Sequence, residues 1–375
     1  MELYLAATCT FGLESVLKRE ILSLGYQIKS IDNGRIYFKS DELAIARTNL
    51  FLRTADRVHI VLSEFPAHDF DELFEGVRSV EWENFISERG QIVVKGRSAG
   101  STIHSVPVAQ SMTKKAIIER LRDRTGKNKI IEDGVLFPVE IELNNDTGRL
   151  MLNTSGDALF KRGYRGATGD APIKETLAAG LIMLSGWKSG EPLVDPFCGS
   201  GTIPIEAAMI KKNMAPGLNR HFLSMKWDFI DKKIWNSAAS EAMDMIRPFE
   251  RAEIFGYDKD PAIIAAASIN AQNAEVEDCA VFKNVPVEML KLKGQPGAVI
   301  TNPPYGERLS DRNEAERLYL RLKTVLQRKH GWSANIITAH PAFQELFGRA
   351  ERKRKLFNGN IKCNYYSYSE QNILR

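Results

Sequence analysis

Over the first 160 residues, short apolar runs alternate with stretches in which apolar residues recur every three or four positions. The short runs predict strands and the periodic stretches predict amphipathic helices. A turn is expected at Asn145-Asp146-Thr147-Gly148, which is typical of a β-hairpin. We therefore expect an α+β module with strands at 3–7, 35–38, 57–62, 91–96, 138–143 and 150–154, and with helices at 12–24, 41–49, 69–77 and 113–124.

The pattern changes after about residue 160, where apolar strands alternate with helical stretches, as in a parallel sheet with helices on both faces. The strands are expected at 191–194, 254–258, 280–282 and 298–300. A segment from Lys211 to Arg251, rich in Met, Trp and Lys, predicts an inserted helical excursion between the first two of them. The sequence thus predicts two domains, at 1–160 and 161–375, the second an α/β doubly wound domain.

Composition limits the number of domains and argues against a membrane segment and a metal site. With 375 residues, 43% apolar and 26% charged, the chain is long enough for two globular domains. We see no signal-peptide pattern and no window near the roughly 18 apolar residues of a membrane helix, so a cytoplasmic protein with no membrane partner is expected. No metal is expected either, because free thiols are the simplest account of the four cysteines, Cys9, Cys198, Cys279 and Cys363.

The net charge of +4 is unevenly distributed, with −3 over the first 160 residues and +7 over the remainder. Either of two basic clusters is compatible with a solvated face. The first, however, has an apolar stripe that would dock a helix and leave its cations outside, and we predict a phosphate-contact surface there. The clusters are Lys114, Lys115, Arg120, Arg122, Arg124, Lys127 and Lys129, and then Arg349, Arg352, Lys353, Arg354 and Lys355.

The most specific chemistry lies at Asn302-Pro303-Pro304-Tyr305, directly after the strand that ends near Thr301. The Asn302 side-chain carbonyl and the Pro303 carbonyl can both accept hydrogen bonds from one exocyclic NH₂ group. The two prolines stiffen the turn, and the ring of Tyr305 can stack on an unstacked nucleobase. The motif therefore indicates a site for the exocyclic amine of a nucleobase, and a plain proline-rich turn after a strand is the alternative.

A second motif, Asp195-Pro196-Phe197-Cys198-Gly199-Ser200-Gly201-Thr202, lies between a short strand and a helix. Strand, glycine turn and helix form a layout that binds nucleotides at a helix N-terminus. Pro204 stands where the third glycine of a dinucleotide fingerprint would fall, which disfavours NAD. Instead, Asp195 can orient the loop and reach the amino-acid end of a cationic ligand.

Two further strand ends carry polar residues. Asp258 lies at the tip of the next strand, where a carboxylate holds ribose hydroxyls in doubly wound folds. Asn284 follows the strand after that and could contact an adenine edge, although a turn-forming role is an equal alternative.

Together these motifs resemble the THUMP-containing RNA guanine-N2 methyltransferases, in a short form of the bacterial 23S ribosomal RNA enzyme. The resemblance rests on Thr301-Asn302-Pro303-Pro304-Tyr305-Gly306-Glu307-Arg308, on Lys161-Arg162-Gly163-Tyr164-Arg165 and on the Asp195 motif. It implies a Rossmann-like catalytic domain preceded by a ferredoxin-like segment and a THUMP RNA-binding domain. It also implies S-adenosyl-L-methionine as the cofactor and RNA, ribosomal above all, as the partner.

The resemblance implies a catalytic set of Asn302, Pro303, Pro304 and Tyr305, and a cofactor set of Asp195, Phe197, Cys198, Gly199, Ser200, Gly201, Thr202, Asp258 and Asn284. Arg165 and Lys174 would contact either the cofactor carboxylate or RNA. Three alternatives stay open: a transfer RNA guanine-N2 methyltransferase, an adenine-N6 DNA methylase, and a non-catalytic RNA-binding factor with a retained pocket.

Overall fold

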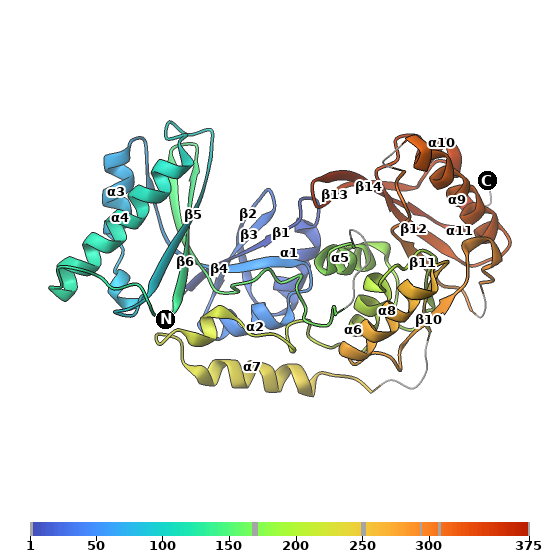
Figure 1. Cartoon of the computed structure of the whole chain (residues 1–375), viewed down its shortest axis with the longest axis horizontal. Helices are drawn as coiled ribbons and strands as arrows, with labels where there is room; N and C mark the ends of the chain where they lie inside the picture. The colour runs from blue at the N-terminus through green and yellow to red at the C-terminus, as the bar shows by residue number, and fades with distance from the viewer. Residues whose placement is uncertain (1–2, 167–171, 249–252, 293–294, 307–308, 374–375) are drawn as a thin grey trace.

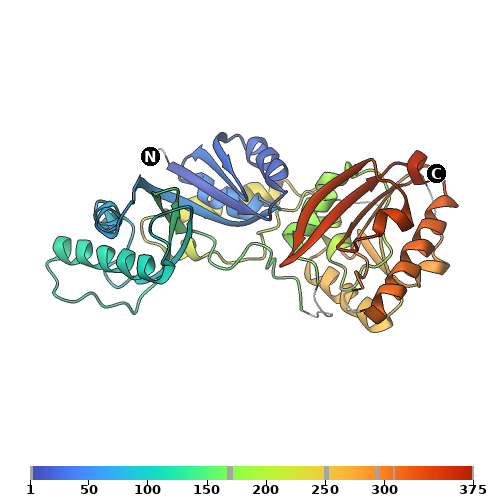
Figure 2. The same cartoon turned by 90° about the horizontal axis from the view of Figure 1, so that it is seen from above.

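The computed structural model describes residues 3–166, 172–248, 253–292, 295–306 and 309–373, and it places two seven-stranded sheets in an elongated molecule (Figures 1 and 2). Glu307 and Arg308 of the longer catalytic motif lie outside the described residues. Within them, no helix is long and apolar enough to cross a membrane, and no group of three or more His, Cys, Asp or Glu residues could hold a metal ion. All four cysteines are buried thiols that form no disulfide within the described residues.

The N-terminal sheet has the order β2-β3-β1-β4-β7-β6-β5, and only the β5–β6 pair is parallel. The long strand β4 pairs with β1 on one side and with β7 on the other, so one continuous sheet serves both halves of the module. Its strands are β1 (Leu3–Cys9), β2 (Gln27–Asp32), β3 (Arg35–Ser40), β4 (Ala55–Pro66), β5 (Gln91–Ala99), β6 (Leu136–Asn144) and β7 (Thr147–Asn153).

Four helices pack on this sheet: α1 (Glu14–Ser23), α2 (Leu43–Phe51), α3 (Phe70–Arg78) and α4 (Val106–Thr125). The predicted hairpin is confirmed, since Asn145 and Asp146 both adopt positive φ, 48° and 59°, between β6 and β7. Helix α4 begins earlier than predicted because Pro107 occupies its first turn, where proline is tolerated. Strand β2 was not predicted, because its residues are mostly exposed and form no apolar run.

The C-terminal sheet has the order β10-β9-β8-β11-β12-β14-β13, with β8 to β12 parallel and β14 antiparallel to both of its neighbours. Leu193 and Ile300 face a core shared with helices α5 and α6, whereas Val194 and Val299 face a core shared with α9. Helices on both faces of a mostly parallel sheet confirm the predicted doubly wound fold.

The strands of this sheet are β8 (Leu193–Asp195), β9 (Ile254–Asp258), β10 (Ala280–Asn284), β11 (Ala298–Thr301), β12 (Ser333–Thr338), β13 (Arg352–Asn358) and β14 (Ile361–Tyr368). Its helices are α5 (Glu175–Ser185), α6 (Thr202–Lys211), α8 (Pro261–Asn273), α9 (Leu309–Gln327), α10 (Phe343–Phe347) and α11 (Glu370–Ile373).

The segment between α6 and β9 forms the predicted excursion, with helix α7 (Lys232–Asp244), but it packs against the N-terminal module (Figure 1). Arg47 of α2 donates two hydrogen bonds to the Glu241 carboxylate of α7, at 2.7 and 2.8 Å. Trp227 stacks on Phe137, and its indole N–H donates to the carbonyl of Leu136 at 3.1 Å. The two modules therefore share buried surface, and a chain lacking residues 1–160 would expose that surface to water.

Replacing Trp227 by alanine is expected to lower the free energy of unfolding by about 3–5 kcal/mol, because the buried ring fills space between the two modules. Urea unfolding, followed by circular dichroism, measures this. The exposed neighbour Lys226 is a matched control, since its replacement by alanine should change stability by no more than about 0.5 kcal/mol. Equal midpoints for the two variants would contradict the shared core.

Candidate active site

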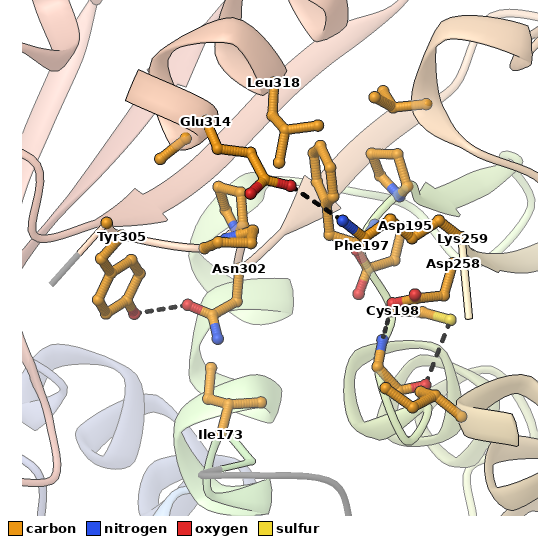
Figure 3. A pocket seen from close by; sticks show the side chains of 18 of the residues that line it. Ile173, Asp195, Phe197, Cys198, Asp258, Lys259, Asn302, Tyr305, Glu314 and Leu318 are labelled. Atoms are coloured by element: carbon orange, nitrogen blue, oxygen red, sulfur yellow. Dashed lines mark hydrogen bonds and ion pairs between the residues drawn. The ribbon is translucent and has the colours of Figure 1, made fainter. Parts of the chain in front are cut away.

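Four neighbouring strands of the C-terminal sheet bring their carboxyl ends to one edge, β10, β9, β8 and β11. Asn284, Asp258 and Asp195 end the first three of these strands, and Asn302 directly follows the fourth. A cavity of about 1290 Å³ lies at this edge (Figure 3). Its lining includes most of the predicted site residues, namely Asp195, Phe197, Cys198, Gly199, Ser200, Thr202, Asp258, Asn302, Pro303, Pro304 and Tyr305.

The glycine turn between β8 and α6 uses its two glycines differently. Gly199 has φ +51° and no atom within 4 Å of the position that a Cβ would occupy, so it leaves open space for a ligand. Gly201 is not among the lining residues, and a Cβ there would lie 2.9 Å from the ring of Phe282. The first glycine thus faces open space in the cavity, whereas the second allows the turn to pack on β10.

Asp258 connects the tip of β9 to this turn. One carboxylate oxygen accepts a hydrogen bond from the backbone N–H of Gly199 at 3.2 Å, and the other accepts from the N–H of Asp260 at 3.0 Å. A carboxylate offers about four acceptor positions, so two remain for ligand hydroxyls at the cavity wall. The side chain is therefore both a brace for the turn and a candidate ribose ligand.

Asn284 lies apart from the other predicted residues. Its side-chain amide is exposed and donates to the carbonyl of Asp258 at 3.0 Å, and the residue is not among those that line the cavity. Pro286 and Val287, just beyond it, do line the cavity, although no sequence signal marked them. The adenine contact of Asn284 stays a prediction. Its hydrogen bond to the Asp258 carbonyl stabilises the turn after β9.

Asp195 is almost fully buried at the end of β8. The hydroxyl of Thr301 donates to its Oδ1 at 2.6 Å, and the backbone N–H of Phe197 donates to the same oxygen at 3.1 Å. Burial raises the pKa of Asp195 to about 7 despite these donors. Thr301 was missed as a functional residue, and its position just before Asn302 was the signal that could have found it.

Cys198 does not supply a nucleophile. Its thiol is buried, and burial raises its pKa well above the ordinary value for cysteine, with further increases from Asp195 and Asp258. A thiol of this kind stays protonated and inert. Its part in the site is to shape the turn.

The Asn302 turn is held by three hydroxyl or amide contacts. The Tyr305 hydroxyl donates to Asn302 Oδ1 at 2.5 Å, and the same hydroxyl accepts from the Asn358 amide at 3.3 Å (Figure 3 shows the first contact). Tyr319 of α9 donates its hydroxyl to the carbonyl of Pro304 at 2.7 Å. The ring of Tyr305 is thus held against Asn302, and a stacking role requires it to rotate away.

Arg165 and Lys174 do not line the cavity. The guanidinium of Arg165 pairs with Glu175 at 2.9 Å and donates to Thr202 Oγ1 at 3.0 Å, so it braces the start of α6. The ammonium of Lys174 lies 4.9 Å from the ring centroid of Phe160. These contacts give Arg165 a structural role through Nη2, while its buried Nε has no hydrogen-bond partner among the described residues.

Comparison with known proteins decides the family. A family described as "RMKL-like, methyltransferase domain" matches residues 162–367, more than half of the chain. The chain belongs to this methyltransferase family. An RlmL ferredoxin-like domain matches residues 4–59, and a THUMP domain matches residues 67–153, which confirms both parts of the expected N-terminal module.

Three relatives of this family member are informative. The "Putative RNA methyltransferase YpsC" of Bacillus subtilis (strain 168) is 44% identical over 97% of this chain and 95% of its own length. The Ribosomal RNA large subunit methyltransferase K/L of Buchnera aphidicola is 33% identical over 96% of this chain, which spans 53% of that protein. The crystal structure of SMU.472, complexed with SAH, is 40% identical with a TM-score of 0.92 over 98% of both chains.

SAH is S-adenosylhomocysteine, the product of S-adenosylmethionine after methyl transfer. The present protein, which belongs to the same family, is therefore an S-adenosylmethionine-dependent methyltransferase, as its sequence predicted. The open space at Gly199 and the acceptor positions of Asp258 suit this cofactor.

Proposed function

We propose that the protein methylates the exocyclic N2 amine of a guanosine in RNA, and that 23S ribosomal RNA is its substrate. The observation that carries the proposal is Asn302 just beyond the tip of β11, in the lining of the cavity and on a chain that also has a THUMP domain. The relative from Buchnera aphidicola, whose name specifies large-subunit ribosomal RNA, supports the choice of substrate.

The size of the cavity supports two occupants. Pockets for one small ligand measure roughly 300–1,000 Å³, and this cavity of about 1290 Å³ exceeds that range. Asp258 and the Gly199 turn lie on the β9 and β8 side, and Asn302 lies on the β11 side. A cofactor on one side and an extruded base on the other would meet between the strand tips.

The chemistry needs positioning more than a strong base. Bound S-adenosylmethionine supplies a methyl group on a positively charged sulfur. The lone pair of an aromatic amine is delocalised into the ring, which makes the amine a poor nucleophile. Hydrogen bonds from both N–H groups, to Asn302 Oδ1 and to the Pro303 carbonyl, would favour a pyramidal nitrogen whose lone pair points at the methyl group.

Base binding would exchange one partner of Asn302 for another. The Tyr305 hydroxyl occupies Asn302 Oδ1, and burial raises the pKa of that hydroxyl, so it stays a proton donor. An incoming amine would take over this acceptor, and the freed ring could stack on the base, a contact worth about 1–3 kcal/mol.

Cofactor affinity is expected to fall about tenfold between pH 8 and pH 6, because Asp195 has a pKa of about 7 and takes up a proton over this range. The cationic amino group of the cofactor would favour the ionised carboxylate, so binding would release that proton. Calorimetric titration with S-adenosylhomocysteine at both pH values measures the change, and Asp195→Asn is the control that should lose it. Equal affinity of the native protein at both pH values would contradict the proposed contact between the Asp195 carboxylate and the amino group of the cofactor.

The proposed substrate is tested by mass spectrometry of nucleosides from ribosomal and transfer RNA of a deletion strain. Loss of N2-methylguanosine from 23S ribosomal RNA, restored by the native gene, is the expected result. Loss from transfer RNA alone would favour the transfer RNA alternative. Methyl incorporation by the purified protein into duplex DNA, with none into RNA, would favour the adenine-N6 DNA methylase.

A further inference from the structure

The edge hairpin of the C-terminal sheet carries cations that the cofactor site does not use. Strands β13 and β14 form this hairpin at the end of the strand order, and Figure 2 shows them as long strands on the side of the sheet near the N-terminal module. We call the surface formed by Lys353, Lys355, Phe357, Lys362 and Phe11 the basic strip.

The strip lies on one face of the hairpin. Alternate residues of a strand share a face at a spacing of about 7 Å, which places Lys353, Lys355 and Phe357 together. Lys362 stands directly opposite Phe357 in the pairing of β13 with β14 and joins the same face. The neighbouring Arg354 points the other way and donates to the carbonyl of Gly12 at 3.0 Å.

The charges of the strip are exposed and lack carboxylate partners. In the described part of the chain, Lys353, Lys355 and Lys362 make no ion pair, and all three are exposed. The basic stretch of α4, predicted from sequence as the phosphate-contact surface, differs in this respect. Its cations are largely neutralised: Lys114 pairs with Glu132, Lys115 with Glu119, Arg120 and Arg124 with Glu83, and Lys127 with Glu88.

Aromatic rings lie between the cations. The ammonium of Lys355 is 5.4 Å from the ring centroid of Phe357 and 5.7 Å from that of Phe11. The two rings meet edge to face, with centroids 6.0 Å apart. Phe11 comes from the N-terminal module and is 43% exposed, so the strip crosses from one module to the other and offers a face on which a base can stack.

The strip ends at the cavity. Asn358 and Ile361, at the turn of the hairpin, both line the cavity that holds Asn302. Asn358 also donates to the Tyr305 hydroxyl. Lys362 directly follows Ile361 in β14, so its backbone adjoins the cavity rim, while its side chain lies on the other face of the hairpin with Phe357.

We propose that the basic strip binds the phosphate backbone of a single-stranded stretch of the RNA substrate and leads the target nucleotide to the cavity. Lysines in a row with interleaved aromatic rings are the features that single-stranded nucleic acid requires. The inference rests on the proposed function, because it takes RNA as the substrate, and it assigns the strip, in place of the α4 stretch, as the main phosphate contact.

Two triple variants of the full-length protein with equal charge loss test this assignment. One is Lys353→Gln, Lys355→Gln and Lys362→Gln, and the other is Lys114→Gln, Lys115→Gln and Lys127→Gln. Fluorescence anisotropy with a 23S ribosomal RNA transcript, over a range of salt concentrations, gives the RNA affinity. Titration with S-adenosylhomocysteine and thermal unfolding report whether the cofactor site and the fold are intact.

The strip variant is expected to bind RNA at least about tenfold more weakly, with a salt slope reduced by about 2 for three lost contacts at roughly 0.7 each. The α4 variant should lose less than twofold, and both should bind S-adenosylhomocysteine as the native protein does. Two outcomes would overturn the RNA-binding role of the strip alone. One is an equal loss of RNA affinity in the two variants, and the other is no loss of RNA affinity in the strip variant while the native protein methylates the RNA. A native protein that neither binds nor methylates RNA would overturn the strip and the proposed function together.

Discussion

Replacing Asn302 by alanine is expected to lower kcat by about 10²–10³-fold, the loss that follows removal of one preorganised hydrogen-bonding group in a transition state. In the proposed mechanism its Oδ1, which lines the cavity beyond the tip of β11, would accept a hydrogen bond from the target amine. The Gly199 turn follows β8 and Asp258 ends β9, so the proposed cofactor contacts are separate from Asn302 and affinity for S-adenosylhomocysteine should stay within about twofold. Methyl transfer under single-turnover conditions, together with calorimetric titration, separates the two quantities.

Tyr305→Phe is the matched variant for this experiment. It removes the hydroxyl that occupies Asn302 Oδ1 and keeps the ring for stacking. We expect a far smaller loss than for Asn302→Ala, since the acceptor itself is retained. Unchanged turnover in Asn302→Ala would eliminate the amine-binding role of this side chain, and a larger loss in Tyr305→Phe would transfer the main role to the tyrosine.

Asp258→Ala should weaken cofactor binding by about 10–100-fold, which corresponds to ~1.5–3 kcal/mol for a charged hydrogen-bond partner. Two effects combine in this variant. The ribose hydroxyls would lose their carboxylate acceptor, and the backbone N–H of Gly199 would lose the oxygen that holds the turn at 3.2 Å. Titration with S-adenosylhomocysteine measures the sum.

Asp260→Ala is the control for the Asp258 variant, because Asp260 lies two residues away and caps helix α8. Its carboxylate accepts from the backbone N–H of Ala262 at 2.8 Å. Loss of this cap should cost about 1 kcal/mol of stability and leave cofactor affinity nearly unchanged. If both variants bind the cofactor equally well, another residue holds the ribose.

Local pattern was sufficient for the strands that form the site. Apolar runs before Asp195, Asp258 and Asn302 predicted buried strands, and each polar residue then had to lie at or just beyond a carboxyl end. Parallel strands bring these ends to one edge of the sheet, so a shared pocket followed without any knowledge of long-range contacts. The pocket in the structure has these three residues in its lining.

Charge clusters were harder to interpret from the chain alone. In the sequence, the Lys and Arg clusters of α4 and of β13 are similar. The apolar stripe of α4 favoured that helix as the phosphate-contact surface. Their difference lies in partners that are distant along the chain, such as Glu83 beside Arg120 and Glu88 beside Lys127. Sequence spacing carries no information about such pairs, because they form only when separate elements pack together.

The sequence by itself determined the fold class and the positions of the Asp195 and Asn302 turns at strand ends, because each depends on residues adjacent along the chain. Only the tertiary structure decided that α7 packs against the N-terminal module, that Tyr305 occupies the acceptor of Asn302 and that Asn358 and Ile361 close the rim of the cavity. These features join segments tens to hundreds of residues apart. Their contacts depend on how the two sheets and their helices bury apolar surface together, which no local pattern specifies.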